Sequence, residues 1–451
     1  MNIKWKKIIG IMLCVSITII MVSGCGESKD PTVVSFWHVY GGQTESPMND
    51  MVNKFNQTVG NRKNIRVKVT SIGDNNSVHK NILASAYEDP GANEMPDMFI
   101  AYPKTVRAMP DKNILVNYDN VLSKEEKDKF VQSFMDEGVV DGKQLVLPVA
   151  KSTEILYINK TGFDKFAEDT GVTLKDLETW EGFFKICQKY KKWTDDKTPN
   201  VKNDGKSFFV HDDHIDFFQT GVASLGGEFF NEKGKINYSK DFYRVWDEYS
   251  TAAVNGYMWL GNGYGTEPFR TGDAIGCVAS SASVMYFADK VTYQDNSEEP
   301  LEIVSLPLPV FEGGEKVAVQ RGAGICTVKS TPEKEKACQE FINWLIEKDN
   351  NVDLVTRLGY IPVTKDAYDL LPTALENLEN PRYKSLYEAV MKTNEDYKFY
   401  TAPQFEGYLE FESNFEESIR SIMREGETVV RQGQSQVSAK VQCLNRFKNI
   451  R

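Results

Sequence analysis

Histidine is scarce in this sequence, and its cysteines are not spaced in pairs. There are four histidines in 451 residues, and the seven cysteines form no CxxC motif. The spacing therefore indicates neither a zinc site of the usual Cys/His type nor a disulfide framework. Five cysteines are scattered beyond residue 25, namely Cys187, Cys277, Cys326, Cys338 and Cys443. We expect most of them to be small core hydrophobes.

Motifs of catalysis and phosphate binding are also missing. The chain has no HExxH, no nucleophile elbow and no phosphate-cradling glycine loop. A glycosidase needs only two carboxylates at a defined separation, and a chain with 64 acidic residues provides such pairs in any fold. We therefore expect that the protein is not an enzyme. The alternative hypothesis is a secreted glycan hydrolase.

Positive charge is in deficit, and no long basic run occurs. The chain has 53 Lys+Arg against 64 Asp+Glu, a net charge of −11. The first 24 residues contain three lysines and no acid, so the rest of the chain carries −14. This balance argues against nucleic acid or anionic lipid as a partner.

The N-terminal segment has the three parts of a secretory signal peptide. Lys4, Lys6 and Lys7 precede an apolar run from Ile8 to Val22. The run is shorter than the ~20 residues of a membrane-spanning helix. We expect residues 1–24 to be a signal peptide that is removed.

The rest of the chain has a composition suited to folded lobes. The sequence is 41% apolar and 12% aromatic, and its length exceeds what a single core usually serves, so two lobes are expected. Strand-like and helix-like patterns alternate over 32–37, 48–55, 65–69, 81–87 and 97–101. This alternation predicts an α/β fold, with ligands beyond the carboxyl ends of the strands.

Further along, several local signals are distinct. Residues 144–153 are extended and contain a proline, which makes them a hinge candidate. Thr179 is expected to cap one helix, and Thr331-Pro332 to begin another. Residues 191–206 are polar and predict a surface loop, whereas the C-terminal tail is expected to be helical.

The end of the signal segment, Val22-Ser23-Gly24-Cys25, resembles the bacterial lipobox. The resemblance implies that Cys25 becomes the new N-terminus and carries acyl chains, with residues 25–31 as a lipidated tether. Two or more chains would anchor the protein stably on the outer face of the cytoplasmic membrane. An ordinary cleavable signal that happens to contain cysteine is the alternative.

Eight short motifs follow in a recognisable order. They are Ser35-Phe36-Trp37-His38, Met95-Pro96-Asp97, Ser152-Thr153 with Leu156–Lys160, Thr179-Trp180-Glu181, Phe269–Ala274, Leu306-Pro307-Leu308-Pro309, Gly322-Ala323-Gly324 and Leu358–Lys365. Together they resemble the family 1 extracellular solute-binding proteins of bacterial ABC importers, which include maltose- and glycerol-3-phosphate-binding proteins.

The resemblance implies a two-lobed periplasmic-binding-protein-like fold of type II. Its lobes would be discontinuous, residues 32–149 with 306–358 and residues 150–305 with 359–451. Hinge crossings would lie near 148–152, 301–309 and 359–364. The implied partners are a small-molecule solute and ABC permease subunits, for a monomer without cofactor or metal.

The motifs match the glycerol-3-phosphate branch best, with two departures. The stretch His211-Asp212-Asp213-His214 replaces a tryptophan-rich loop, and no Lys or Arg occurs between Lys398 and Arg420. Because a phosphate normally requires a cation, we expect a carbohydrate, in oligosaccharide form, as the solute. A glycerol-3-phosphate or glycerophosphodiester ligand is the alternative.

Candidate ligand-binding residues follow from loop position and from the resemblance. They are Tyr40, Gln43, Glu45, Asn76, Tyr102, Ser152, Thr153, Asp213, Trp259, Ser280, Ser281, Gly322, Gly324 and Tyr360. Trp259 is the candidate for stacking on a sugar face, with a core position as the alternative. The pair His211 and His214 could ligate zinc if helical, but a cleft wall or a surface cap is preferred.

Overall fold

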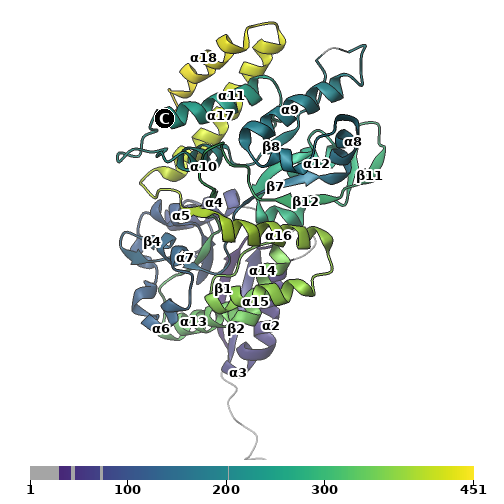
Figure 1. Ribbon diagram of the computed structural model, residues 1–451. Helices are drawn as coiled ribbons and strands as arrows, with labels where there is room; N and C mark the ends of the chain where they lie inside the picture. The colour runs from purple at the N-terminus through teal and green to yellow at the C-terminus, as the bar shows by residue number, and fades with distance from the viewer. Residues whose placement is uncertain (1–29, 42–45, 72–74, 202, 451) are drawn as a thin grey trace, which may run out of the picture.

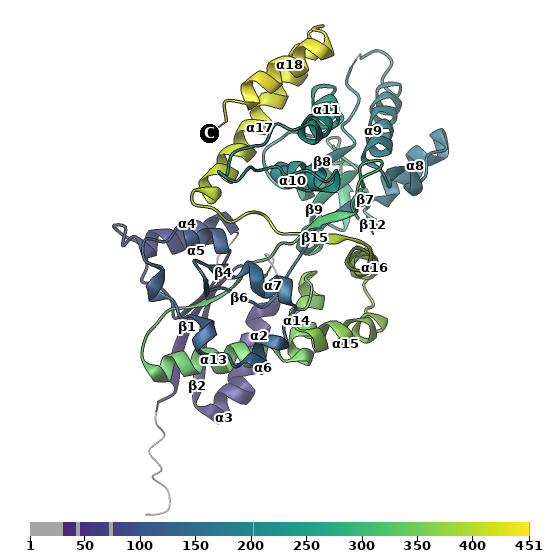
Figure 2. The ribbon, with the colours of Figure 1, turned by 60° about the vertical axis from the view of Figure 1, so that its left-hand side comes forward.

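The computed structural model describes residues 30–41, 46–71, 75–201 and 203–450, without the side chains of residues 71, 75 and 76. The chain forms two lobes stacked one above the other (Figure 1). We call them the first lobe, built on the sheet that contains β1, and the second lobe, built on the sheet that contains β7. Figure 2 shows the two lobes from the side, with the C-terminal helices on the second lobe. The lipobox residue Cys25 lies outside the described residues.

The first sheet has five strands in the order β2-β1-β3-β14-β6. Their bounds are β1 Thr32–His38, β2 Ile65–Ser71, β3 Met98–Ala101, β6 Leu147–Pro148 and β14 Gly324–Thr327. β1 pairs in parallel with β2 and β3, as predicted for βαβ units, whereas β14 runs antiparallel to β3 and β6. The helices of this lobe are α2 Pro47–Phe55, α3 Asn61–Lys63, α4 Asn75–Ala86, α5 Pro103–Arg107, α6 Lys124–Asp128, α7 Gln132–Glu137, α13 Pro332–Ile346 and α14 Lys348–Leu358.

The second sheet has four strands in the order β12-β7-β9-β8. Their bounds are β7 Glu154–Asn159, β8 Phe209–His211, β9 Gly276–Ser280 and β12 Ile303–Leu306. Its helices are α8 Lys160–Thr170, α9 Trp180–Asp195, α10 His214–Ser224, α11 Lys240–Val254, α12 Thr266–Thr271, α17 Tyr408–Arg431 and α18 Gln436–Phe447. Two more helices, α15 Lys365–Glu376 and α16 Pro381–Asp396, follow the third crossing. Short two-stranded ladders join β4 Val139–Val140 to β5 Lys143–Gln144, β10 Lys290–Thr292 to β11 Glu298–Pro300, and β13 Val317–Val319 to β15 Lys398–Tyr400.

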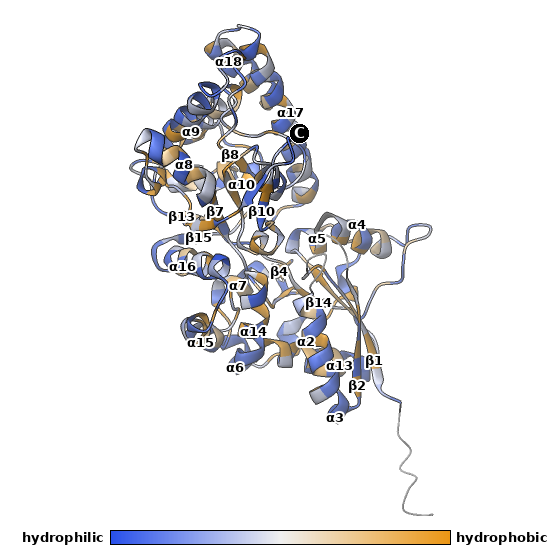
Figure 3. Cartoon of the chain, turned by 90° about the vertical axis from the view of Figure 1, so that its right-hand side faces the viewer, coloured by the Kyte–Doolittle hydropathy of each residue, from blue (hydrophilic) through white to orange (hydrophobic). Residues whose placement is uncertain are grey.

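Strand β7 is buried on both faces, which explains its continuous apolar sequence. Ile155 and Tyr157 point into the core shared with α16, whereas Leu156 and Ile158 point into the core beneath α8–α11. This is the two-residue alternation of a strand. In Figure 3 the strands are mostly hydrophobic, and hydrophilic residues gather on the helices around them.

Local signals at helix ends are confirmed, and some boundaries are corrected. Thr179 and Thr331 accept hydrogen bonds from the first turns of α9 and α13, as expected of N-caps. The helix predicted from residue 81 begins at Asn75, and α9 continues to Asp195 into the predicted loop of 191–206. The five described cysteines are buried and free, as expected of core residues. Among the described helices, none combines the length and the apolar character that a membrane crossing requires.

Three segments run between the lobes beside one another. Lys151 forms an antiparallel bridge with Ile361, and Ser152 forms one with Arg321. The second crossing therefore passes through residues 319–323, later than the 301–309 expected from sequence. The reason is that β12 pairs with β7 within the second sheet, and Leu308 and Phe311 are buried in the core beneath α8–α11. Residues 306–311 thus lie with the second lobe, not with the first.

Candidate functional site

Two adjoining cavities lie between the lobes. Their volumes are about 420 Å³ and about 220 Å³. They have five lining residues in common, Tyr102, Asp212, Asp213, Tyr264 and Arg321, so we treat them as one inter-lobe cleft. Tyr102 directly follows β3 of the first sheet and Asp212 directly follows β8 of the second. The cleft thus lies at carboxyl ends of strands, where α/β folds bind ligands.

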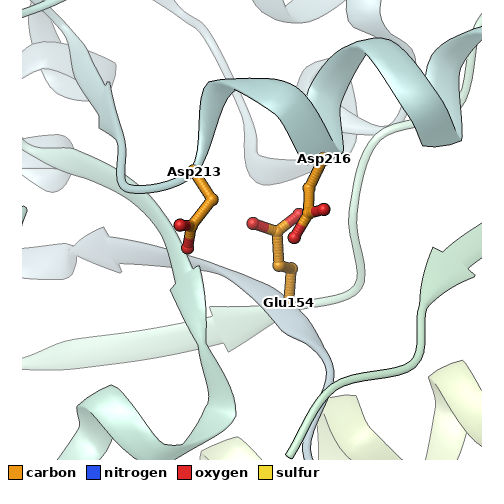
Figure 4. Close-up of side chains that lie close together, drawn as sticks. All are labelled: Glu154, Asp213 and Asp216. Atoms are coloured by element: carbon orange, nitrogen blue, oxygen red, sulfur yellow. The ribbon is translucent and has the colours of Figure 1, made fainter. Parts of the chain in front are cut away.

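A cluster of three carboxylates lies at the cleft, where Asp213 and Asp216 line the wall and Glu154 is buried behind them. Figure 4 shows the Asp216 carboxylate, from the first turn of α10, beside that of Glu154 at the start of β7, with Asp213, which directly precedes α10, to one side of them. One oxygen from each lies within 4.8 Å of the others. Carboxylates so close together repel one another unless a cation or protons compensate their charge.

Arg321 supplies that cation. Its Nη1 lies 2.6 Å from Asp213 Oδ2, 3.4 Å from Glu154 Oε1 and 3.5 Å from Asp216 Oδ2. The bridge between Arg321 and Ser152 fixes this position, because Glu154 follows Ser152 by two residues and so lies on the same side of the strand. One guanidinium therefore compensates a cluster assembled from two crossings and one helix.

The charges of the cluster are unevenly distributed. Burial favours the neutral form of Asp213, but Arg321 outweighs burial and holds the pKa of Asp213 below its usual value. Burial raises the pKa of Asp216 to about 7 and, together with Asp216 itself, raises the pKa of Glu154 well above its usual range. Asp212 also has a pKa raised to about 7, by burial and by the neighbouring Asp213. Near neutral pH Asp212 and Asp216 are therefore partly protonated.

The stretch His211-Asp212-Asp213-His214 forms a cleft wall and not a surface cap. Asp212 and Asp213 line the cleft, whereas His211 and His214 are each 1% exposed behind it. Tyr249 Oη lies 2.8 Å from His214 Nδ1, so this nitrogen is already engaged. His211 lies on β8, outside any helix, and burial lowers its pKa to about 3. Because His211 lies on β8 and His214 is the first residue of α10, the two histidines do not share a helix face. The zinc-binding arrangement that depended on such a face is therefore not formed by these two residues.

Two further cations line the cleft, each with its own carboxylate. Lys104 from α5 of the first lobe forms an ion pair with Glu412 from α17 of the second lobe. Arg420 donates to the backbone oxygen of Asp212 at 2.5 Å and lies 3.3 Å from Glu416. Tyr286 also spans the lobes, because its hydroxyl donates to Gly41 O at 3.1 Å.

None of these three cations is among the residues predicted from the sequence. The stretch between Lys398 and Arg420 has no positive charge, whereas Lys104 follows β3 and Arg321 immediately precedes the motif Gly322-Ala323-Gly324. The position of Lys104, two residues after the candidate Tyr102, was a usable signal. Arg321 had a similar one, since the glycine motif beside it was already a candidate.

Five of the fourteen candidate residues line the cleft: Tyr102, Ser152, Asp213, Ser280 and Tyr360. Tyr40, Thr153 and Ser281 are buried behind its surface. Tyr40 packs edge-on against Tyr360, with ring centroids 5.3 Å apart, and the Thr153 hydroxyl donates to Val319 O at 2.9 Å.

The other candidates are not placed at the cleft surface. Gly322 and Gly324 shape the backbone of the second crossing; Gly322 has φ +109°, and a Cβ there would lie 2.8 Å from Ala150 O. Trp259 is half-buried and packs against the core that contains Ile155 and Tyr157. It does not line either cavity. Gln43 and Glu45 lie outside the described residues, as does the side chain of Asn76.

Comparison with known proteins places this geometry in a family. Residues 50–381 match the family described as bacterial extracellular solute-binding protein. The arabinooligosaccharide-binding protein of Bacillus subtilis is 21% identical over 374 residues, which cover 80% of this chain and 82% of that protein. The sn-glycerol-3-phosphate-binding periplasmic protein UgpB of Brucella melitensis is 23% identical over 353 residues, or 75% of this chain and 76% of that protein.

Solved structures have the same fold. UgpB from Mycobacterium tuberculosis, in complex with glycerophosphocholine, superposes with a TM-score of 0.68 at 18% identity, over 94% of this chain and 98% of that one. At this identity the likeness concerns the two-lobed α/β fold. The match over residues 50–381 covers well over half of the chain, and the chain therefore belongs to the bacterial extracellular solute-binding proteins.

Proposed function

We propose that the protein is a lipid-anchored solute-binding component of an ABC importer that captures a carbohydrate between its lobes. Closure around the solute would be favoured by contacts made only in the closed state. The solute would then pass to a permease pair in the membrane. The candidate residues that line the cleft would make the first contacts.

The observation that carries the carbohydrate assignment is the pairing of the cations in the cleft. Lys104, Arg321 and Arg420 each have a carboxylate partner, so a phosphate would have to compete with Glu412, Asp213 and Glu416 for them. Carboxylates and serine hydroxyls accept hydrogen bonds from sugar hydroxyls, and tyrosine rings offer flat apolar faces. A largely neutral polyol suits this lining better than an anion.

A glycerophosphodiester is the second candidate. It is favoured by the presence of three cations in the cleft lining and by the relationship to glycerol-3-phosphate-binding proteins. Arg321 is suited to bidentate contact with a phosphate. Such a ligand would have to draw the guanidinium away from Asp213.

A thermal shift panel tests the solute class. Residues 26–451, which contain every described element, would be melted with mono- and oligosaccharides, glycerol-3-phosphate and glycerophosphodiesters. A solute at ~100 times its dissociation constant adds about 2.7 kcal/mol of stability. We expect a shift with one class of oligosaccharide. A shift with phosphate compounds alone would refute the carbohydrate assignment and support the second candidate.

The lipid anchor has a separate test. In the full chain, Cys25→Ser removes the residue that would be acylated, and Cys14→Ser within the signal segment is the matched control. We expect the wild type and the Cys14 variant to enter the detergent phase on phase partitioning and the Cys25 variant to be released. Release of both variants, or of neither, would contradict acylation at Cys25.

A further inference from the structure

The cleft has more carboxylates than its cations can pair with. The larger cavity is lined by six acidic and three basic side chains, namely Glu137, Asp212, Asp213, Asp216, Glu412 and Glu416 against Lys104, Arg321 and Arg420. Three acids are taken by the pairs described above, and Glu137 is held by Lys151 at 2.6 Å. Asp212 and Asp216 are left without a cation of their own.

The two surplus carboxylates are held only weakly. Asp212 Oδ1 accepts a hydrogen bond from the backbone of Gly265 at 2.6 Å, which supplies a dipole and not a charge. Asp216 Oδ2 lies 3.5 Å from Arg321, whose Nη1 is 2.6 Å from Asp213. Arg321 therefore pairs mainly with Asp213, and its contact with Asp216 is the weaker of the two.

Buried groups behind Asp216 are also unsatisfied. Among the described residues, Glu154 Oε2 and both ring nitrogens of His211 have no hydrogen-bond partner. Glu154 is 0% and His211 1% exposed, and His211 Nδ1 lies 4.0 Å from Glu154 Oε1, on the cluster side. Burying such groups without partners is unfavourable. Arg321 alone therefore does not satisfy every buried polar group of the cluster.

Aromatic rings lie beside these carboxylates. Tyr102, Tyr264, Tyr286 and Tyr360 line the smaller cavity together with Asp212 and Asp213. Tyr264 and Tyr286 are 58% and 49% exposed, so both side chains are accessible from solvent. Ring faces attract cations, and aromatic residues with carboxylates are the usual environment for ammonium groups.

We propose that the solute bound in the cleft carries a positively charged nitrogen, which lies against Asp216 and Asp212 and beside the tyrosine rings. The inference rests on the proposed solute-binding function and narrows the class of solute. Two sources share this chemistry. One is an oligosaccharide that contains amino sugars, and the other is a choline-type headgroup on a glycerophosphodiester.

Two matched pairs of probes test the inference and separate the sources. The glucosamine trimer differs from cellotriose in having ammonium groups where cellotriose has hydroxyls. Glycerophosphocholine differs from glycerophosphoglycerol in its quaternary nitrogen. Affinities for residues 26–451 would be measured by calorimetric titration at constant ionic strength.

We expect the cationic member of one pair to bind at least about tenfold more tightly than its partner. The pair that shows the preference identifies the source. Equal or tighter binding of the partner that lacks the cationic nitrogen, in both pairs, overturns the inference and leaves solute binding standing. Binding of cellotriose or another neutral sugar, with no binding of either cationic probe, overturns it in the same way. A protein that binds no sugar and no glycerophosphodiester overturns both the inference and the proposed function.

Variants test the assignment of residues. Asp216→Asn and Asp212→Asn keep the side-chain volume and remove the charge, and Asp369→Asn on the exposed face of α15 is the matched control. We expect either cleft variant to reduce affinity for the probe with the cationic nitrogen by about tenfold and to change affinity for the partner that lacks it by less than about twofold. Equal losses for both members of the pair overturn the assignment. Melting temperatures establish that each variant is folded, and either variant alone suffices for the test.

Discussion

The backbones of Ser152 and Arg321 are joined by two hydrogen bonds, each 2.8 Å long, one in each direction. These residues belong to two different crossings between the lobes. The same ladder directs the Arg321 side chain toward Glu154 and the carboxylates of α10. The hinge and the charged wall of the cleft are therefore one structural unit, and closure and ligand chemistry should affect each other.

Replacing Arg321 should destabilise the protein in a pH-dependent way. Arg321→Met leaves three clustered carboxylates without their cation, which we expect to lower the free energy of unfolding by about 3 kcal/mol at pH 8. Without Arg321 the pKa of Asp213 rises above its unfolded value, so the loss should shrink as the pH falls toward 5. Urea unfolding at several pH values measures this, with Arg62→Met on the exposed α3 as control. A loss that is independent of pH would contradict the electrostatic account.

The unliganded wild type should become less stable as the pH rises. Asp212 and Asp216 have folded pKa values near 7 and Glu416 near 8, whereas unfolded carboxyls titrate near 4. Between these values the folded state binds more protons than the unfolded state, so the free energy of unfolding falls from about pH 5 to pH 8. Asp216→Asn should reduce that fall by about 1 kcal/mol or more, and Asp369→Asn should leave it unchanged. A wild-type stability that rises over this range would refute the assignment.

The buried ammonium of Lys151 should hold the crossings together. Its Nζ donates to Glu137 Oε2 at 2.6 Å and to Gly322 O at 2.8 Å, and Gln320 donates to the same carboxylate. Lys151→Met should lower stability by about 3 kcal/mol, because Glu137 stays buried without its cation. Adding Glu137→Gln should restore part of the loss. Chemical denaturation of both variants gives the comparison, and no recovery in the double variant would count against the pairing.

The ion pair between Lys104 and Glu412 should favour the closed arrangement of the lobes. It joins α5 to α17 across the cleft. Lys104→Met should shift the unliganded protein toward open forms and raise the radius of gyration measured by small-angle scattering. Lys63→Met is the control, since its partner Glu340 lies within the first lobe. An unchanged radius in the Lys104 variant would show that the pair does not influence closure.

Gly322 should tolerate no side chain. Its φ of +109° would strain the backbone of an alanine. An alanine Cβ would also lie only 2.8 Å from Ala150 O, which is too close. We expect Gly322→Ala to lower the free energy of unfolding by more than about 1 kcal/mol. Gly91→Ala is a matched control, because Gly91 has φ +84° and a Cβ there would meet nothing within 4 Å. Equal losses at the two sites would mean that backbone strain alone, and not the close crossing, limits Gly322.

Much of the fold was predictable because its signals are local. The β1–β3 strands, the caps at Thr179 and Thr331 and the helical tail each follow from periodicity or capping within a few residues. The second crossing was misplaced because 301–309 and 317–323 are both extended segments. What separates them is pairing with β7, a contact more than 140 residues distant in sequence.

The site was predictable only in part for the same physical reason. Tyr102 and Asp213 follow strands whose ends meet at the cleft, and that rule can be applied to sequence. The pairing of Lys104 with Glu412 joins residues 308 positions apart, and no local pattern records it. Nor does any local pattern show that Thr153 and Ser281 turn into the core while Ser152 and Ser280 line the cleft.

The most direct test of the account is titration of residues 26–451 with oligosaccharides while small-angle scattering follows the radius of gyration. The account predicts saturable binding at one site, with a decrease in radius that follows occupancy and is weakened by Tyr102→Ala in the cleft. Saturable binding with an unchanged radius, or binding that Tyr102→Ala leaves unaffected, would contradict capture of the solute between the lobes.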